Sequence, residues 1–208
     1  TAVDGESIVG LTVNDAVTRM RGAPGTSITI TIAREGVEPF DVPITREIIN
    51  VRSVTSRMEG TDIGYIRIST FNERTSTMLQ DALRNIRRDG GANLRGVVID
   101  LRNNPGGLLE QSVDVSDAFL EGGEVVSVRG RQPGDMHRYN ARRGDDLQGL
   151  PIAVLINGAS ASAAEIVAGA LQDRNRAVII GMDSFGKGSV QTVLPLQGGR
   201  EGAVRLTT

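Results

Sequence analysis

The chain has 208 residues, 39% of them hydrophobic, which is enough for one substantial core or for two small domains. Lys and Arg (23) nearly balance Asp and Glu (25), and no basic run is long enough to follow a phosphate backbone, so nucleic acid is not an expected partner. No apolar stretch approaches the roughly 20 residues that cross a bilayer, and the N-terminus lacks the pattern of a secretion signal.

The residue types present limit the possible chemistry. The absence of cysteine excludes a cysteine nucleophile, thiolate metal sites and disulfides. The single histidine, His137, lies in a polar segment that predicts an exposed loop, which is a poor setting for the base of a Ser-His-Asp mechanism. A histidine zinc site would need three or four ligands. We therefore expect any hydrolysis to use no histidine, metal or cofactor.

The opening segment predicts a helix followed by a hairpin. Apolar residues at helical spacing mark a short helix within 11–20, and glycines at 22 and 25 end it. β-Branched residues alternate over 27–33, and a second strand is expected near 40–44 after a Glu35-Gly36 turn. This segment is too small to hold a core by itself.

From residue 63 onward, strands alternate with helices. Strands are expected at 63–68, 96–101, 125–128, 152–156, 178–180 and 190–194, helices at 75–88, 108–119 and 162–171, and a polar loop at 131–149. The nearly continuous apolar run over 96–101 is typical of a strand covered on both faces. The alternation indicates an α/β layer structure.

A turn of small residues with hydroxyl groups precedes the helix expected at 162–171. A serine at the first turn of a helix, such as Ser162, lies in an electropositive region, and free amides such as the N–H of Ala163 can stabilise an oxyanion. Ser162 to Glu165 also form a capping box, which requires no catalysis. Ser160 is a rival nucleophile that spacing alone does not exclude.

Two further glycine-rich segments carry candidate groups. Lys187 lies between two glycines, and a lysine acts as a base only where burial lowers its pKa, so this hypothesis requires a desolvated site. Gln191 follows and could orient the lysine. Residues 100–107 form a polar turn at the end of a strand, where α/β sheets bind ligands, and the Gly106 N–H could face an oxyanion. Each feature also has a plain structural interpretation, as a solvated lysine, an edge residue and a Pro-Gly turn.

In this order, the three segments resemble motifs of the carboxyl-terminal processing (tail-specific) serine proteases. The family motifs D-L-R-x-N-P-G-G, G-S-A-S-A-x-E and G-K-G-x-V-Q correspond to residues 100–107, 158–165 and 186–191, with alanine at 159 where the family often has serine. The resemblance selects Ser162 over Ser160 as nucleophile. It further implies Lys187 as base, Gln191 as its orienting partner, and the N–H groups of Gly106 and Ala163 as the oxyanion hole.

Residues 1–46 look like the C-terminal half of a PDZ domain, and residues 47–208 look like a catalytic core of the crotonase/ClpP-like layered α/β type. In the family, a carboxylate-binding loop precedes the part matching Thr1, and the chain continues beyond the part matching Thr208. We therefore expect a fragment that cleaves substrates feebly or not at all. An incomplete PDZ leaves a strand edge unpaired, which favours self-association through 1–44 or poor order of that region.

The resemblance predicts a serine endopeptidase that acts through an acyl-enzyme on proteins recognised by their C-terminal tails. The implied partners are protein or peptide substrates with unstructured C-termini and an adaptor protein, and the implied location is the bacterial periplasm or cell envelope. Two alternatives stay open. One is a crotonase-like enzyme acting on an acyl thioester, and the other is a PDZ scaffold with an inactive catalytic body.

Overall fold

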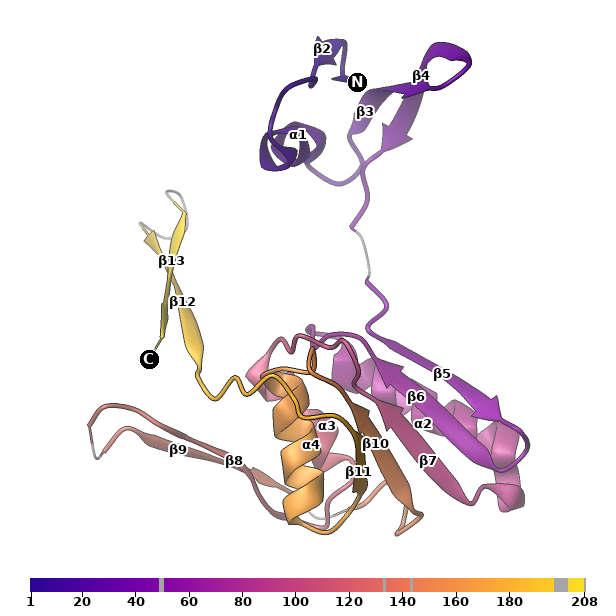
Figure 1. The fold of residues 1–208 in the computed structure, drawn as a ribbon, viewed down its shortest axis with the longest axis vertical. Helices are drawn as coiled ribbons and strands as arrows, with labels where there is room; N and C mark the ends of the chain where they lie inside the picture. The colour runs from indigo at the N-terminus through magenta and orange to yellow at the C-terminus, as the bar shows by residue number, and fades with distance from the viewer. Residues whose placement is uncertain (49–50, 133, 143, 197–201, 208) are drawn as a thin grey trace. The chain divides into compact units, whose positions relative to one another are not determined.

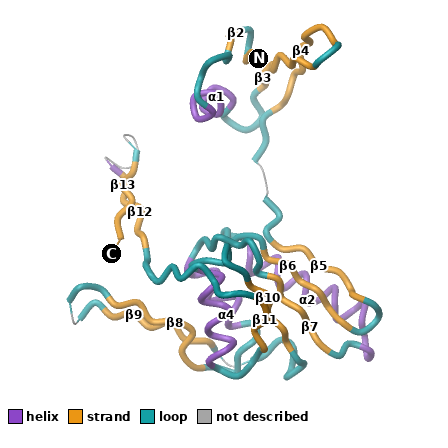
Figure 2. The backbone as a smooth tube through the Cα atoms, in the orientation of Figure 1, coloured by secondary structure: helices purple, strands orange, loops and turns teal. Residues whose placement is uncertain are grey.

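The computed structural model describes residues 1–48, 51–132, 134–142, 144–196 and 202–207. The chain divides into two compact units, Thr1–Val51 and Arg52–Thr208. The division lies slightly after the boundary between residues 46 and 47 expected from the sequence. Figures 1 and 2 show the elements of each unit.

The first unit is a four-stranded antiparallel sheet with one short helix. Its elements are β1 (Ala2–Val3), β2 (Glu6–Ser7), α1 (Val13–Met20), β3 (Ser27–Arg34) and β4 (Val37–Thr45). The strand order is β2-β1-β3-β4, so the predicted helix and hairpin are confirmed. Among the described residues of this unit, only Val3 and Ile28 are buried, as expected for a segment without a core of its own.

In its described residues, the second unit contains a mixed sheet, three α-helices and two hairpins outside that sheet. Its elements are β5 (Val54–Glu59), β6 (Ile63–Ile68), α2 (Thr75–Gly90), the 3₁₀ turn η1 (Gly91–Asn93), β7 (Gly96–Asp100), α3 (Leu109–Asp117), β8 (Gly123–Arg129), β9 (Met136–Ala141), β10 (Ile152–Ile156), α4 (Ala163–Asp173), β11 (Val178–Gly181), β12 (Gln191–Pro195) and β13 (Ala203–Thr207). The sheet order is β11-β10-β7-β6-β5. β6, β7, β10 and β11 are parallel, and β5 is antiparallel to β6. Helices α2, α3 and α4 lie in the connections that parallel pairing requires.

One hydrophobic core joins the helices to alternate residues of the sheet. Ile66 and Ile99, which are neighbours in the β6–β7 register, belong to it together with the buried apolar positions of the three helices. Tyr65, Arg67 and Asp100 occupy the alternate positions and therefore project from the opposite face. β7 is buried or half-buried throughout, as its apolar run predicted, but polar side chains rather than an apolar layer cover Asp100.

The polar segment after β8 forms a strand. Residues 131–149 were expected to be a loop, but β9 pairs antiparallel with β8 and places His137 opposite Val128. The prediction is therefore wrong over Met136–Ala141, because β9 is mostly polar, Ala141 is its only buried residue, and its order comes from pairing rather than burial. β12 pairs in the same way with β13, which the sequence pattern did not predict.

Candidate active site

Three loops with candidate functional residues leave the same edge of the five-stranded sheet. They follow β7, β10 and β11, which are adjacent and parallel, so their carboxyl ends lie together. Hydrogen bonds join the first two loops directly. The Ala161 N–H donates to the carbonyl oxygen of Asn104 at 2.9 Å, and Ser160 Oγ donates to that of Leu101 at 2.8 Å. The fold therefore holds the turn that carries Gly106 against the turn that carries Ser162.

Ser162 occupies a strained turn between β10 and α4. It is the N-cap residue of α4 and has φ 56° and ψ −115°, a conformation that side-chain-bearing residues rarely adopt. Its N–H donates to Glu165 Oε2 at 2.7 Å, which is one hydrogen bond of the predicted capping box. Ala163 begins α4, where first-turn amides have no carbonyl partner inside the helix. A half-buried hydroxyl beside such amides is well placed for attack on a carbonyl.

Ser160 has a different environment from Ser162. It is fully buried, its Oγ donates to the carbonyl oxygen of Leu101, and the Asn157 N–H donates to that Oγ at 3.0 Å. The hydroxyl therefore connects two loops and has no exposed surface on which a substrate could react. This geometry favours Ser162 of the two candidate nucleophiles.

Gly106 lies against the nucleophile turn, but its N–H is already paired. Its φ is +97°, and a Cβ at this position would lie 2.8 Å from Ser162 Cβ and 2.9 Å from the Ala163 nitrogen. The Gly106 N–H donates to Asn104 Oδ1 at 2.8 Å in a buried hydrogen bond. In this arrangement Asn104 occupies the Gly106 N–H, so its role in an oxyanion hole stays a prediction, whereas the Ala163 N–H lies at the helix N-terminus.

The loop after β11 brings the backbone of Lys187 to the serine turn. The Lys187 N–H donates to Glu165 Oε2 at 2.9 Å, the same oxygen that accepts from Ser162. Lys187 is exposed, so the desolvated site expected for a base is not present in this arrangement. Among the residues that the structure describes, no hydrogen bond joins the side chain of Lys187 to that of Ser162 or Gln191.

The other two candidates lie in hairpins. Gln191 begins β12, is exposed, and is paired in the ladder with Thr207. His137 is exposed on β9 rather than in a loop. Neither position has the burial expected of a residue that orients or supplies a catalytic base.

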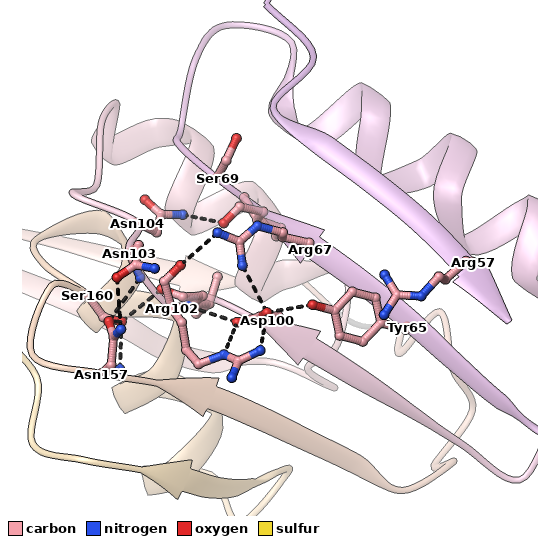
Figure 3. A network of polar contacts seen from close by, with 12 residues as sticks. Arg57, Tyr65, Arg67, Ser69, Asp100, Arg102, Asn103, Asn104, Asn157 and Ser160 are labelled. Atoms are coloured by element: carbon pink, nitrogen blue, oxygen red, sulfur yellow. Dashed lines mark hydrogen bonds and ion pairs between the residues drawn. The ribbon is translucent and has the colours of Figure 1, made fainter. Parts of the chain in front are cut away.

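A buried carboxylate anchors the glycine turn, and the sequence reasoning treated it only as part of a motif. Asp100 accepts hydrogen bonds from Tyr65, Arg67 and Arg102 on the open face of the sheet (Figure 3). Burial by itself raises the pKa of Asp100, but the hydrogen bonds from Arg102 and Tyr65 outweigh this effect and hold the pKa below its usual range. The Arg57 guanidinium lies over the Tyr65 ring, 3.9 Å from its centroid. The carboxylate therefore stays ionised and fixes the start of the turn.

A pair of asparagines links the same turn to the serine loop. The Asn103 N–H donates to Asn157 Oδ1, and Asn157 Nδ2 donates to Asn103 Oδ1, each at 2.9 Å (Figure 3). Asn103 has φ 59°, which lies in the left-handed region that asparagine tolerates better than most residues. These reciprocal bonds strengthen the contact between the loops after β7 and β10.

No group of three or more potential metal-binding side chains gathers anywhere in the described part of the chain. Within the same residues, none of the helices is long and apolar enough to cross a bilayer.

Comparison with known proteins finds a peptidase family and similar proteases. The model of peptidase family S41 matches residues 62–208. A carboxy-terminal-processing protease of Bartonella bacilliformis is 56% identical over 99% of this chain and 47% of its own length. The carboxy-terminal processing protease CtpA of Bacillus subtilis is 38% identical over 91% of this chain and 40% of its length. The chain thus spans about half the length of these curated relatives.

A solved structure has a similar fold. The photosystem II D1 C-terminal processing protease superposes with a TM-score of 0.65 at 29% identity, and the match covers 99% of this chain and 56% of that one. This chain is a mixed α/β protein with several sheets, and its fold is similar to that of the solved structure. From the family match over most of its length and from these relatives, we conclude that the chain belongs to peptidase family S41.

Proposed function

We propose that this chain carries the catalytic centre of a serine endopeptidase in which Ser162 is the nucleophile and Lys187 the base. The observation that carries the proposal is the position of Ser162. It occupies a strained turn at the N-terminus of α4, in contact with the loop after β7 and joined through Glu165 to the loop that carries Lys187. Strained backbone of this kind is concentrated at functional sites.

In the proposed reaction, Ser162 Oγ forms a bond to the peptide carbonyl carbon and its proton passes to the Lys187 amine. The negative charge on the carbonyl oxygen is stabilised by the Ala163 N–H at the helix N-terminus. The C–N bond then breaks, and the leaving amine takes the proton from Lys187. Water repeats the sequence on the acyl-enzyme and releases the acid. Because Lys187 is exposed here, its action as a base requires that substrate or a neighbouring segment cover it.

The remaining assignments follow from the relatives and from the sequence. The names of the relatives support cleavage near protein C-termini, and substrates with unstructured tails fit that activity. We further propose that residues 1–46 are the C-terminal half of a PDZ domain and that the catalytic core has crotonase/ClpP-like layering. The same proposal includes an adaptor protein and a periplasmic or cell-envelope location. It also includes self-association through 1–44 and an orienting role for Gln191.

A fluorophosphonate probe tests the central claim. Its reaction forms an Oγ–P bond, breaks the P–F bond and transfers the serine proton to a base, so it requires an activated serine. The probe is small and needs no C-terminal tail, so the feeble cleavage of tailed substrates expected of a fragment does not apply to it. We expect labelling of the wild type and its loss in Ser162→Ala and in Lys187→Ala. Labelling that survives in Ser162→Ala would refute the assignment. Absence of labelling in a folded wild type would favour an acyl-thioester enzyme or an inactive scaffold.

A further inference from the structure

Glu165 makes more hydrogen bonds than a helix cap requires. Its Oε2 accepts from the N–H groups of Ser162 at 2.7 Å and Lys187 at 2.9 Å. Its Oε1 accepts from Ser184 Oγ at 2.7 Å and from the Gly186 N–H at 2.6 Å. An ionised carboxylate has about four acceptor positions, and all of them are used here.

The four donors come from two separate segments of the chain. Of the four bonds that Glu165 accepts, a capping box accounts only for the one from the Ser162 N–H, whereas the other three donors belong to the loop after β11. One backbone hydrogen bond joins the same two segments, from the Phe185 N–H to the carbonyl oxygen of Ser160 at 3.0 Å. Three of the four partners are backbone N–H groups, which can only donate, and an ionised carboxylate accepts all four bonds. The pKa direction agrees, because burial raises the pKa of Glu165 but the hydrogen bonds, led by that of Ser184, outweigh burial and lower it.

We propose that Glu165 is a positioning residue that sets the backbone of Lys187 relative to Ser162, and that Ser184 assists by holding the carboxylate in place. The inference rests on the proposed function, in which Ser162 and Lys187 react together. The backbone N–H groups of Ser162 and Lys187 both donate to the same carboxylate oxygen, Glu165 Oε2. Displacement of the lysine loop would therefore slow proton transfer while leaving the substrate-binding surface largely intact.

The substitution Glu165→Gln separates charge from shape. The amide keeps the length of the side chain but presents an NH₂ group to two of the four donors, so about half of the acceptor positions are lost. Ser184→Ala removes a single bond on the lysine side and leaves the bond from Ser162 intact. Glu110→Gln is the matched control, because Glu110 is an exposed carboxylate in the first turn of α3.

Hydrogen–deuterium exchange of the 208-residue protein reports directly on the hydrogen bonds between Glu165 and the loop that carries Lys187. We expect faster exchange in the segment 184–188 for Glu165→Gln and for Ser184→Ala, with no change for Glu110→Gln. Thermal unfolding identifies any variant that is not folded, and Ser184→Ala keeps the test valid if Glu165→Gln fails to fold. Unchanged exchange in the folded variants would overturn the inference.

Fluorophosphonate labelling of Ser162 reports the catalytic consequence. We expect the labelling rate to fall by at least about tenfold in Glu165→Gln, the scale at which small displacements of reacting groups affect rates. A smaller fall is expected in Ser184→Ala, and the Ser184 effect should vanish in the double variant because both changes act through one carboxylate. On a cleavable peptide, kcat should fall while KM changes little.

The outcomes distinguish a failure of the proposed function from a failure of the positioning role of Glu165. A wild type without Ser162-dependent labelling would refute the proposed function, and the positioning role with it. If Glu165→Gln and Ser184→Ala are labelled at the wild-type rate, the positioning role alone is overturned. Additive effects in the double variant would mean that Ser184 acts independently of Glu165, which would also contradict the proposal.

Discussion

Replacing Gly106 with alanine tests the contact between the glycine turn and the nucleophile turn. Gly106 has φ +97°, and its added Cβ would lie 2.7 Å from the carbonyl oxygen of Ala161 and 2.8 Å from Ser162 Cβ. An unfavourable φ costs about 1–3 kcal/mol, and overpacking against atoms that cannot easily move costs about 1–3 kcal/mol more. We therefore expect Gly106→Ala to lower the free energy of unfolding by about 2–6 kcal/mol.

Gly149 provides a matched control for the backbone contribution. Its φ is +82°, but no described atom lies within 4 Å of its Cβ position. Gly149→Ala should therefore lose only the strain contribution, about 1–3 kcal/mol. Urea unfolding of both variants measures the difference, and fluorophosphonate labelling should fall on the order of tenfold in Gly106→Ala alone. Equal destabilisation of the two variants would refute the close packing of the two turns and the reasoning built on it.

Three further predictions concern the serines, the lysine and the buried carboxylate. Ser160→Ala should retain probe labelling, unlike Ser162→Ala, but should lose about 1–3 kcal/mol of stability because it removes the two hydrogen bonds that the buried hydroxyl makes with Leu101 and Asn157; urea unfolding and labelling together test this. Lys187→Arg should be as inactive in a peptidase assay as Lys187→Ala, since a guanidinium stays protonated and cannot accept the serine proton; turnover in the arginine variant would contradict a base role. The folded-state pKa of Asp100 is lowered, so its stabilising contribution is present above the unfolded-state value of about 3.9 and is lost as pH falls through the folded-state value. Asp100→Asn should therefore be less stable at neutral pH and should lose less stability on acidification below pH 4, and an unchanged acid titration of unfolding would refute this.

Local pattern predicted most of the regular structure of this chain. The apolar spacing over 75–88 predicted a helix, and α2 runs over Thr75–Gly90; the apolar run at 152–156 is β10. These predictions succeed because periodic burial reports which face of an element contacts the core. β9 and β13 were missed for the same reason, since all residues of β13 and half of those of β9 are exposed and their order comes from pairing with the preceding strand.

The sequence by itself determined which residue types are available for catalysis. It contains no cysteine and one histidine, together with Ser162, Lys187 and glycine turns in the order typical of one peptidase family. Tertiary structure alone decided which groups meet. The parallel pairing of β7, β10 and β11 brings three loop ends to one edge. As a result Ser160 is buried with its hydroxyl bonded to Leu101, and Glu165 joins the serine turn to the lysine loop. Such contacts depend on strand register between segments far apart in the chain, and local spacing carries no information about that register.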